Sequence, residues 1–395
     1  MRSKKQFWQR HWRKQRNQLI KIVDTIEESG KTEKLPEGTR PGSFSSAAKV
    51  TVRVVDPLTD ASWDQAVSAH PQSNIFHSTA WARVLNKTYG HIPIYLQFCR
   101  GTGTFGLVPM MEVISSVTGR RGVSLPFSDF CEPLPPSEPD ADLLLDKLVE
   151  LARERKWDYF QLRGGRGNLP TGAIADVERF YGHKLDLSVG RDSLFGGFDG
   201  SVRRAVRKAE NCGIRIEISS ARKAMLDFYY LHVRTRGRHG LPPQSLSFFL
   251  NIDEEIMKRQ LGFIVLAKRQ NKPIAGAVFF CSRDTALFKF GASDERTHQF
   301  RGNNLVMWEG IRHLVGKGLK TLHFGRTALN NAGLRRFKLS WGTEEEVIEY
   351  FRFALSPQRW LNSVRNASDF HNQLFRSLPP FVNRFAGALI YSHLD

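Results

Sequence analysis

After its first 49 residues, the chain alternates between segments with helical spacing of apolar residues and segments with the spacing of strands. Residues 50–57 alternate in period two, 77–90 have helical spacing and end in a glycine, and 104–115 read as a strand. The alternation of helical and strand segments starts again with a helical segment at 200–213, which a strand at 214–219 follows. This alternation, with antiparallel hairpin signals, predicts a mixed α/β or α+β fold.

One helix–strand unit occurs twice. The stretches LVELARERKWDYFQLRGG and IRHLVGKGLKTLHFGRT share a helix, a basic turn, a short strand and a glycine beside an arginine, and aligning Leu162 with Phe324 places them 162 residues apart. The 395 residues exceed one ordinary core, so we predict two duplicated domains, although many helix–strand units share this pattern. The predicted parts are a tail and linker at 1–49, a first domain at 50–190, a second at 191–360 and a C-terminal helical extension at 361–395.

The composition is that of a globular protein with excess positive charge. Apolar residues make up 41% and charged residues 25%, and the formal net charge is +19. Such charge favours an anionic partner, namely tRNA, a phosphorylated or nucleotide-linked substrate, or an acidic membrane; the alternative is a basic chain without a dedicated partner.

The four cysteines are dispersed and form no CxxC pair, so we expect no metal site and a reducing compartment. We find no apolar run long enough for a transmembrane helix, and the N-terminal region lacks the apolar core of a secretory signal. We therefore expect a cytoplasmic protein, with peripheral contact to the inner membrane as a further possibility.

Residues 1–26 have the spacing of a basic amphipathic helix. Such a helix suits contact with an anionic membrane surface or with RNA; a frayed tail, or residues added by an early start codon, would look the same. Residues 27–49 are polar and rich in Gly, Pro and Ser, which predicts a linker.

Two segments are candidate anion sites. Gln299, Gly302 and Asn304 lie where a loop opens a helix, and they approach the Q/R-x-x-G-x-G/A loop with which the GNAT (general N-acetyltransferase) superfamily holds the CoA pyrophosphate; an ordinary loop-to-helix turn is the alternative. Arg203 and Arg207 lie on the basic face of the predicted helix at 200–213 and suit phosphate or RNA contact, or simply a solvated face.

Two loops carry candidate acid–base groups. His239 lies in RTRGRHGLP, where it could transfer a proton or donate to a phosphate, although a loop histidine often does neither. Asp129 lies in LPFSDFCEPLPP, where a carboxylate could orient an incoming amine. Cys131 in the same loop has no nearby base in the sequence, which favours a buried thiol over a nucleophile.

The segment HFGRTALNNAGLRRFKLSWG places cations at the end of a predicted strand. Arg336 and Lys338 flank Phe337 in a short helix, and Arg326 precedes it. We predict that the two arginines bind substrate and that Lys338 binds a phosphate or stabilises charge developing on a carbonyl oxygen, with Phe337 beside it; a basic surface helix is the alternative.

These motifs together resemble the Fem-type peptidyltransferases, which add amino acids from aminoacyl-tRNA to cell-wall precursors. The resemblance is carried, in the family's order, by NIFHSTAWARVL, FSDFCEPL, GSVRRAVRKAENCGIRIEI, RTRGRHGLP, KPIAGAVFF, LFKFGAS, LVMWEGIRHLVGKGLKTLHFGRT and GLRRFKLSWG, over roughly residues 50–355.

The resemblance implies two tandem GNAT-like domains in an α+β fold and direct attack of an acceptor amine on an activated acyl group. It places the family's Phe-Lys pair on Phe337 and Lys338. His323 stands where the family has Asp, and Cys131-Glu132 where it has a Gly-Gly-type dipeptide. With no tRNA-holding helical hairpin evident, the chain resembles the branch linked to envelope or exopolysaccharide genes, whose donor is acyl-CoA or aminoacyl-tRNA.

We therefore predict an N-acyltransferase that moves an acyl or aminoacyl group onto an amine of an envelope or polysaccharide precursor, with no certain cofactor beyond the acyl donor. The alternatives are an acetyl-CoA-dependent N-acetyltransferase and a non-enzymatic protein that binds RNA or a membrane.

Overall fold

The computed structural model describes residues 50–100, 103–134, 141–166, 169, 177–361 and 386–394, without the side chains of 103–105 and 141. The predicted tail helix and linker at 1–49 and most of the predicted C-terminal extension lie outside these ranges. The described residues belong to one compact unit by backbone contacts.

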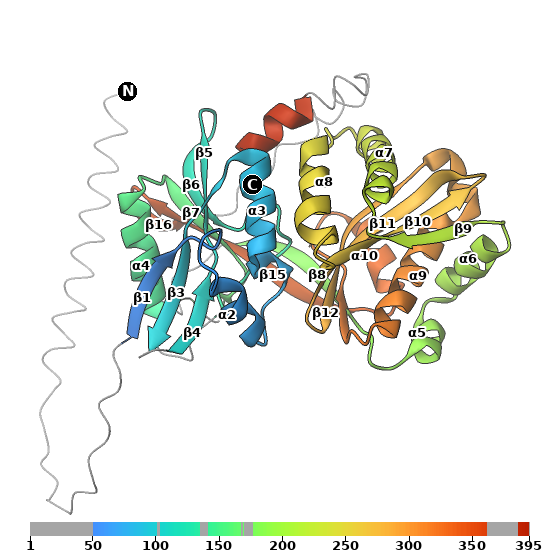
Figure 1. Cartoon of the computed structure of the whole chain (residues 1–395), viewed down its shortest axis with the longest axis horizontal. Helices are drawn as coiled ribbons and strands as arrows, with labels where there is room; N and C mark the ends of the chain where they lie inside the picture. The colour runs from blue at the N-terminus through green and yellow to red at the C-terminus, as the bar shows by residue number, and fades with distance from the viewer. Residues whose placement is uncertain are drawn as a thin grey trace, which may run out of the picture. The chain divides into compact units, whose positions relative to one another are not determined.

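The N-terminal half contains two sheets. Strands β1, β3 and β4 form a small antiparallel sheet, and the other strands belong to a long mixed sheet (Figure 1). The elements here are β1 (Val50–Val55), α2 (Trp63–Ala69), η1 (Ile75–His77), α3 (Thr79–Tyr89), β2 (Ile92–Pro93), β3 (Tyr95–Arg100), β4 (Gly103–Val108), β5 (Met111–Ser115), β6 (Gly119–Ser124), α4 (Ala141–Glu154), β7 (Tyr159–Arg163) and β8 (Glu178–Asp186).

The C-terminal half adds helices to both faces of the long sheet. Its elements are α5 (Arg191–Gly197), α6 (Gly200–Glu210), β9 (Arg215–Ser219), α7 (Arg222–Arg238), α8 (Leu246–Ile252), the π-helical turn η3 (Asp253–Met257), β10 (Gly262–Arg269), β11 (Lys272–Ser282), β12 (Thr285–Ser293), η4 (Glu295–Phe300), α9 (Gly302–Gly316), β13 (Thr321–His323), β14 (Thr327–Ala328), α10 (Ala332–Leu339), β15 (Glu344–Leu355), β16 (Gln358–Leu361) and η5 (Tyr391–His393). A short helical stretch at 386–390 precedes η5.

Alternating side chains of β10 assign each helix layer to one face of the sheet. Ile264 and Leu266 join the core that contains α7 and α8, whereas Phe263, Val265 and Ala267 join the core that contains α6 and α9. Figure 1 shows the two helix layers on opposite sides of β10 and β11. Burial on both faces explains why this strand is almost continuously apolar.

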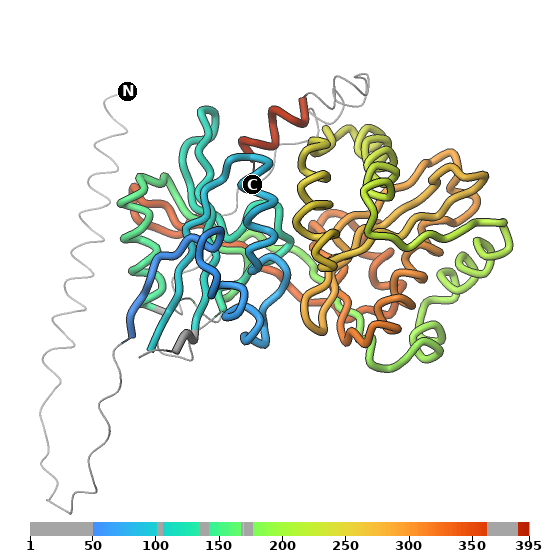
Figure 2. The backbone as a smooth tube through the Cα atoms, in the orientation of Figure 1, coloured from blue at the N-terminus to red at the C-terminus, as the bar shows by residue number. Residues whose placement is uncertain are grey.

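The long sheet runs in the order β2-β5-β6-β7-β15-β8-β13-β12-β11-β10-β9. Strand β8 follows β7 in the chain but pairs with β13, whereas β15 follows β13 but pairs with β7. In Figure 2 the late strands β15 and β16 accordingly lie among the early elements. One sheet therefore passes through both halves, and the predicted boundary at 190/191 stays a prediction.

The repeated unit has a structural counterpart. Helix α4 connects β6 to β7, which are parallel, and α9 connects β12 to β13, which are also parallel. Each is a strand–helix–strand crossover, and its second part, the helix and the following strand, is the unit that the alignment of Leu162 with Phe324 matches.

One predicted element was wrong. Residues 104–115 contain two strands in two different sheets, β4 and β5. The backbone changes sheet near Pro109, whose missing N–H cannot join a strand ladder.

Candidate active-site cleft

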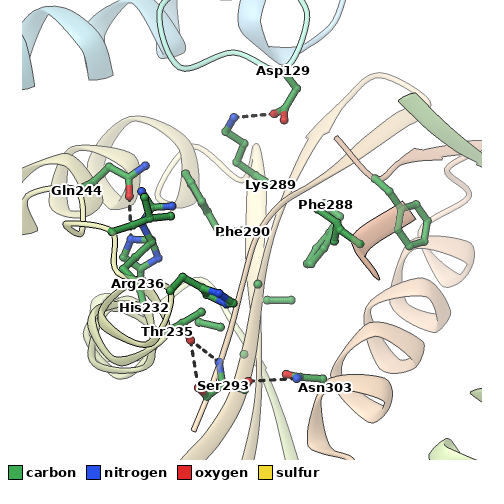
Figure 3. Close-up of a pocket in the computed structure, with 18 of the residues that line it drawn as sticks. Asp129, His232, Thr235, Arg236, Gln244, Phe288, Lys289, Phe290, Ser293 and Asn303 are labelled. Carbon is green, nitrogen blue, oxygen red and sulfur yellow. Dashed lines mark hydrogen bonds and ion pairs between the residues drawn. The ribbon is translucent and has the colours of Figure 1, made fainter. Parts of the chain in front are cut away.

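The cleft arises where two parallel strands stop pairing. Strand β13 pairs with only the first three residues of β12, Thr285 to Leu287. Strand β12 continues to Ser293, and along this part β11 is its only strand neighbour among the described strands. A cavity of about 890 Å³, here the main cavity, is lined by residues 288–293 and by side chains from α7, α9, α10 and the 127–129 loop (Figure 3).

A buried ion pair lies in the wall of the main cavity. Lys289 Nζ donates to Asp129 Oδ2 at 2.7 Å and to the Phe127 carbonyl at 2.7 Å, and its ammonium lies 4.9 Å from the centre of the Phe76 ring. The carboxylate also accepts the backbone N–H of Arg326 at 3.2 Å. Figure 3 shows Lys289 on its strand reaching toward Asp129 on the loop opposite.

The environment sets the charges of this pair. Burial alone would raise the pKa of the Asp129 carboxyl, but Lys289, with a smaller contribution from Arg326, holds that pKa at about 2. Burial lowers the pKa of Lys289, and the charge of Asp129 opposes this. A carboxylate with a pKa of about 2 is a weak general base near neutral pH, so its main effect here is to hold Lys289 and the loop.

Lys338 enters the main cavity from α10. Helix α10 starts at the Asn331 cap, whose side chain accepts the Leu334 N–H at 3.1 Å. Lys338 is only 2% exposed, and its Nζ donates to the carbonyls of Gly325 at 2.8 Å and Arg326 at 3.1 Å. Burial lowers the pKa of Lys338 to about 8. An ammonium has three N–H donors, and two of them have partners among the described residues.

Gly325 allows this close packing. It has a φ of +71°, and a Cβ atom there would lie 2.9 Å from Asp129 Oδ1. His323 Nδ1 accepts the Gly325 N–H at 2.8 Å. The histidine that stands where the Fem family has Asp therefore supports the turn that brings Asp129 and Lys338 together.

Helix α7 and the C-terminal segment form another wall. Thr235 Oγ1 donates to the Ser293 carbonyl at 3.1 Å and accepts the Ser293 N–H at 2.9 Å, which fixes α7 against β12. Buried His232 contacts Gln244 at 2.8 Å, and burial lowers its pKa to about 3. Arg236 donates to the hydroxyl of Tyr391 at 2.6 Å, so a residue near the C-terminus lines the cavity.

The structure gathers five predicted residues around the main cavity and leaves the others away from it. Those lining it are Asp129, His239, Arg326, Phe337 and Lys338. His239 is exposed, and its Nε2 lies 3.3 Å from a guanidinium nitrogen of Arg238.

The predicted anion loop divides between two locations. Gly302 and Asn304 line a small pocket of about 120 Å³ at the N-terminus of α9, where Arg301 has the positive φ of +58°. A Cβ on Gly302 would lie 3.3 Å from the Cβ of Ala275, so a larger residue would crowd β11. Gln299 is exposed and lines neither this pocket nor the main cavity.

The remaining predicted arginines lie on surfaces. Arg336 is exposed on α10 and lines neither cavity, whereas its neighbour Lys338 faces inward. Arg207 is exposed on α6, with its guanidinium 5.7 Å from the centre of the Phe195 ring, and half-buried Arg203 also lies away from both cavities. Their positions fit a solvated helix face.

Sequence reasoning missed Lys289, Arg236 and Tyr391. Lys289 had a detectable signal, since it interrupts the apolar strand segment TALFKFGAS, where a charged residue requires a buried partner. Arg236 lies in the segment that was singled out for His239. Tyr391 gave no signal, because its contact with the cavity depends on a long-range return of the chain.

Comparison with known proteins identifies the architecture. Residues 198–352 match the family described as "Acetyltransferase (GNAT) domain". The solved structure of FemX matches with a TM-score of 0.60 and 15% identity, over 76% of this chain and 96% of FemX. This chain has a Fem-like, tandem GNAT fold. The predicted resemblance and fold class are confirmed at this level.

Two other solved structures share the arrangement. A tandem GNAT protein from the clavulanic acid biosynthesis pathway matches with a TM-score of 0.51 and 11% identity, over 78% of this chain and 99% of that one. The C-terminal domain of a putative lysylphosphatidylglycerol synthetase from Agrobacterium fabrum matches with a TM-score of 0.50 and 14% identity, over 80% and 96%. No curated protein sequence matches this chain.

The described part of the chain shows no cluster of three or more His, Cys, Asp or Glu side chains suited to a metal. None of its described helices combines the length and apolarity needed to cross a bilayer. All four cysteines lack disulfide partners, and burial raises the pKa of Cys131, which supports its prediction as a buried thiol.

Proposed function

We propose that this protein is an N-acyltransferase that moves an acyl or aminoacyl group onto an amine of a cell-envelope or polysaccharide precursor, in the cytoplasm. The observation that carries the proposal is the main cavity between β12 and β13, which receives the buried ammonium of Lys338. Support also comes from the GNAT match over 198–352 and from the FemX fold.

The geometry suits direct transfer. The acceptor nitrogen would attack the acyl carbon of the donor, and the bond from that carbon to the donor's oxygen or sulfur would break with its electron pair going to that atom. The amine would lose one proton and the leaving oxygen or sulfur would gain one, which gives an amide and a free hydroxyl or thiol. Protonated Lys338 would stabilise negative charge on the acyl oxygen or on a phosphate, because an ammonium in a desolvated site interacts more strongly than in water. The one N–H donor of Lys338 that has no partner among the described residues, beyond the two held by Gly325 and Arg326, would make this contact.

In this scheme Asp129 and Lys289 are positioning residues. Their ion pair connects β12 to the 127–129 loop across the cavity. Arg326 lies beside them with its guanidinium 4.5 Å from the centre of the Phe180 ring, and it would contact an anionic part of the substrate. The pocket at Gly302 and Asn304 would receive a phosphate of the donor at the α9 N-terminus.

The proposal is tested by comparing envelope precursors from cells that carry the wild-type chain, Lys338→Met or Arg336→Met, using mass spectrometry. We expect an acyl or aminoacyl mass increment with wild type and Arg336→Met, and its loss with Lys338→Met. Identical precursor masses in all three strains and in a strain lacking the gene would refute it. Thermal shift of the purified protein with acetyl-CoA would distinguish an acyl-CoA donor from an aminoacyl-tRNA donor.

A further inference from the structure

A second cavity lies on the other side of the 127–131 loop. It has a volume of about 320 Å³ and is lined by η1, the end of β11, the start of β12, β13, β15 and Phe130. Asp129 faces the main cavity and its neighbour Phe130 faces the second one. We call the second the His323 cavity, because His323 lies in its wall and packs 4.4 Å from Phe130, ring centre to ring centre.

The His323 cavity carries negative charge on a basic protein. Its charged lining residues are Glu132, Glu346 and Lys184. The Glu346 carboxylate already has two partners, because it contacts His323 Nε2 at 3.0 Å and accepts a hydrogen bond from Lys184 Nζ at 2.5 Å. Burial would raise the pKa of Glu346, but these two partners hold it at about 2. Burial lowers the pKa of His323 itself, so the histidine adds no full charge at neutral pH.

Glu132 is the unmatched charge. It is exposed at the cavity, and its side chain has no ion-pair or hydrogen-bond partner among the residues that the structure describes. Although part of its surface reaches solvent, the Glu132 carboxyl is closely surrounded by protein atoms, and this desolvation together with the nearby charge of Glu346 raises the pKa of Glu132. The side chain packs against Gly164, where an added Cβ would lie 2.3 Å from the Glu132 Cγ. Its backbone carbonyl contacts buried His77 Nε2 at 2.8 Å, which fixes the residue at this position.

Two further features indicate a ligand. Ser73 lines the cavity and is only 5% exposed, yet its hydroxyl has no hydrogen-bond partner among the described residues. A buried hydroxyl without a partner costs free energy unless a ligand or water satisfies it. The lining also has an apolar part, made by the side chains Phe76, Phe130, Phe280, Leu287 and Ile348, beside polar residues that include Asn74, Thr285 and Thr321.

We propose that the His323 cavity is a second binding site, for a primary ammonium group carried on an apolar body. Glu132 provides the charge that pairs with the ammonium, and Glu346 provides the second carboxylate. The apolar side chains cover the aliphatic or aromatic part, and Ser73 contributes a hydroxyl. This site is separate from the main cavity, and binding of the ammonium ligand to it does not depend on the proposed acyl transfer.

The test is calorimetric titration of the full chain with n-hexylammonium chloride, with n-hexanol as the uncharged probe. We expect saturable binding of one hexylammonium and weaker binding of hexanol. Glu132→Gln should weaken hexylammonium binding about tenfold, the effect of losing a hydrogen bond to a charged group. Glu254→Gln is the matched control, since it removes the same charge from a half-buried residue outside the cavity that already pairs with Lys258, and it should leave binding unchanged.

Val347→Trp locates the bound probe. Val347 lines the His323 cavity and is 59% exposed, so a larger side chain there can fill the opening without entering the core. We expect this variant to lose hexylammonium binding. The proposal is overturned if wild type shows no saturable binding, if Glu132→Gln and Glu254→Gln bind alike, or if Val347→Trp binds as tightly as wild type.

Discussion

The two parallel strand pairs of the sheet end in opposite ways. In the first, β6 and β7 pair as far as Ser124 and Leu162, and the following loop then fills the space between them. Cys131 N donates to the Arg163 carbonyl at 2.8 Å, and Ser124 Oγ accepts the Arg163 N–H at 3.0 Å. In the second, β12 and β13 stop pairing at Leu287, and the main cavity lies beyond.

The difference shows how one duplicated unit can provide a scaffold and the other a site. The gap beyond β6 and β7, here the closed gap, is filled by the loop that follows β6. This loop pairs with the backbone groups at the end of β7, and its Leu125 and Cys131 are fully buried. The gap beyond β12 and β13, here the open gap, leaves one side of the end of β12 without a neighbour among the described strands, and Lys289 and Lys338 line the space there. The loop that closes the first gap also supplies Asp129 to the second, so the scaffold half completes the site.

The largest expected effect comes from removing the Asp129 carboxylate, which the loop after β6 supplies to the main cavity. Asp129→Ala leaves Lys289 buried without its carboxylate, and we expect the free energy of unfolding to fall by about 3–5 kcal/mol. Urea denaturation measures this loss. The double variant Asp129→Ala/Lys289→Met should recover much of it, because no buried charge is left unpaired; equal instability of the single and double variants would contradict the coupling.

Lys338→Met tests the open gap directly. We expect acyl transfer to fall about 10²- to 10³-fold, which is typical for the loss of one preorganised charged donor. The variant should fold normally, since the methionine fills a similar volume. Arg336→Met is the control on the same helix with its side chain in solvent. Similar rates for the two variants would remove Lys338 from the mechanism.

Ser124→Ala tests the closed gap. The change leaves the Arg163 N–H and the Cys131 carbonyl without their hydroxyl partner, so unfolding should become easier by about 1–3 kcal/mol. Acyl transfer at a temperature where the variant is folded should stay near the wild-type rate. A selective loss of activity with unchanged stability would show that the first gap is also a site.

The pH profile should follow the charge of Lys338. Its pKa in the folded chain is about 8, below the usual value, so the ammonium is present below pH 8 and is lost as the pH rises through that value. We expect kcat/KM to fall above pH 8 and approach a tenfold decrease per pH unit. Lys338→Arg should remove this decrease because a guanidinium stays charged; a profile unchanged by that substitution would assign the decrease to another group.

Tyr391→Phe gives the smallest expected effect. The hydroxyl accepts from Arg236 and donates to the Pro242 carbonyl at 3.1 Å, so its removal should cost about 0.5–1.5 kcal/mol in the free energy of unfolding. The main cavity would also lose a fixed part of its wall. A change in the KM for the acyl acceptor larger than the change in kcat would identify Tyr391 as a contact that selects the acceptor.

The sequence by itself determined the local elements and the presence of a repeated helix–strand unit. The spacing of apolar residues decides which face of a segment is buried, and this spacing can be read from residues that are close together in the chain. The helices around Trp81 and Val306 bury their apolar faces in this way. The motif order also predicted the Fem-like tandem fold and singled out Lys338, which points into a cavity.

Only the tertiary structure decided which gap is open and which residues meet there. The exchange of β8 and β15 between halves, and the pairing of Asp129 with Lys289 across 160 residues, depend on contacts that no local pattern encodes. Arg336 and Lys338 are two cations on one short helix, and helix periodicity alone places them on different faces. The tertiary structure decides which of them faces water and which is buried. The reason is that the direction of each side chain is set by how α10 packs against the turn at Gly325.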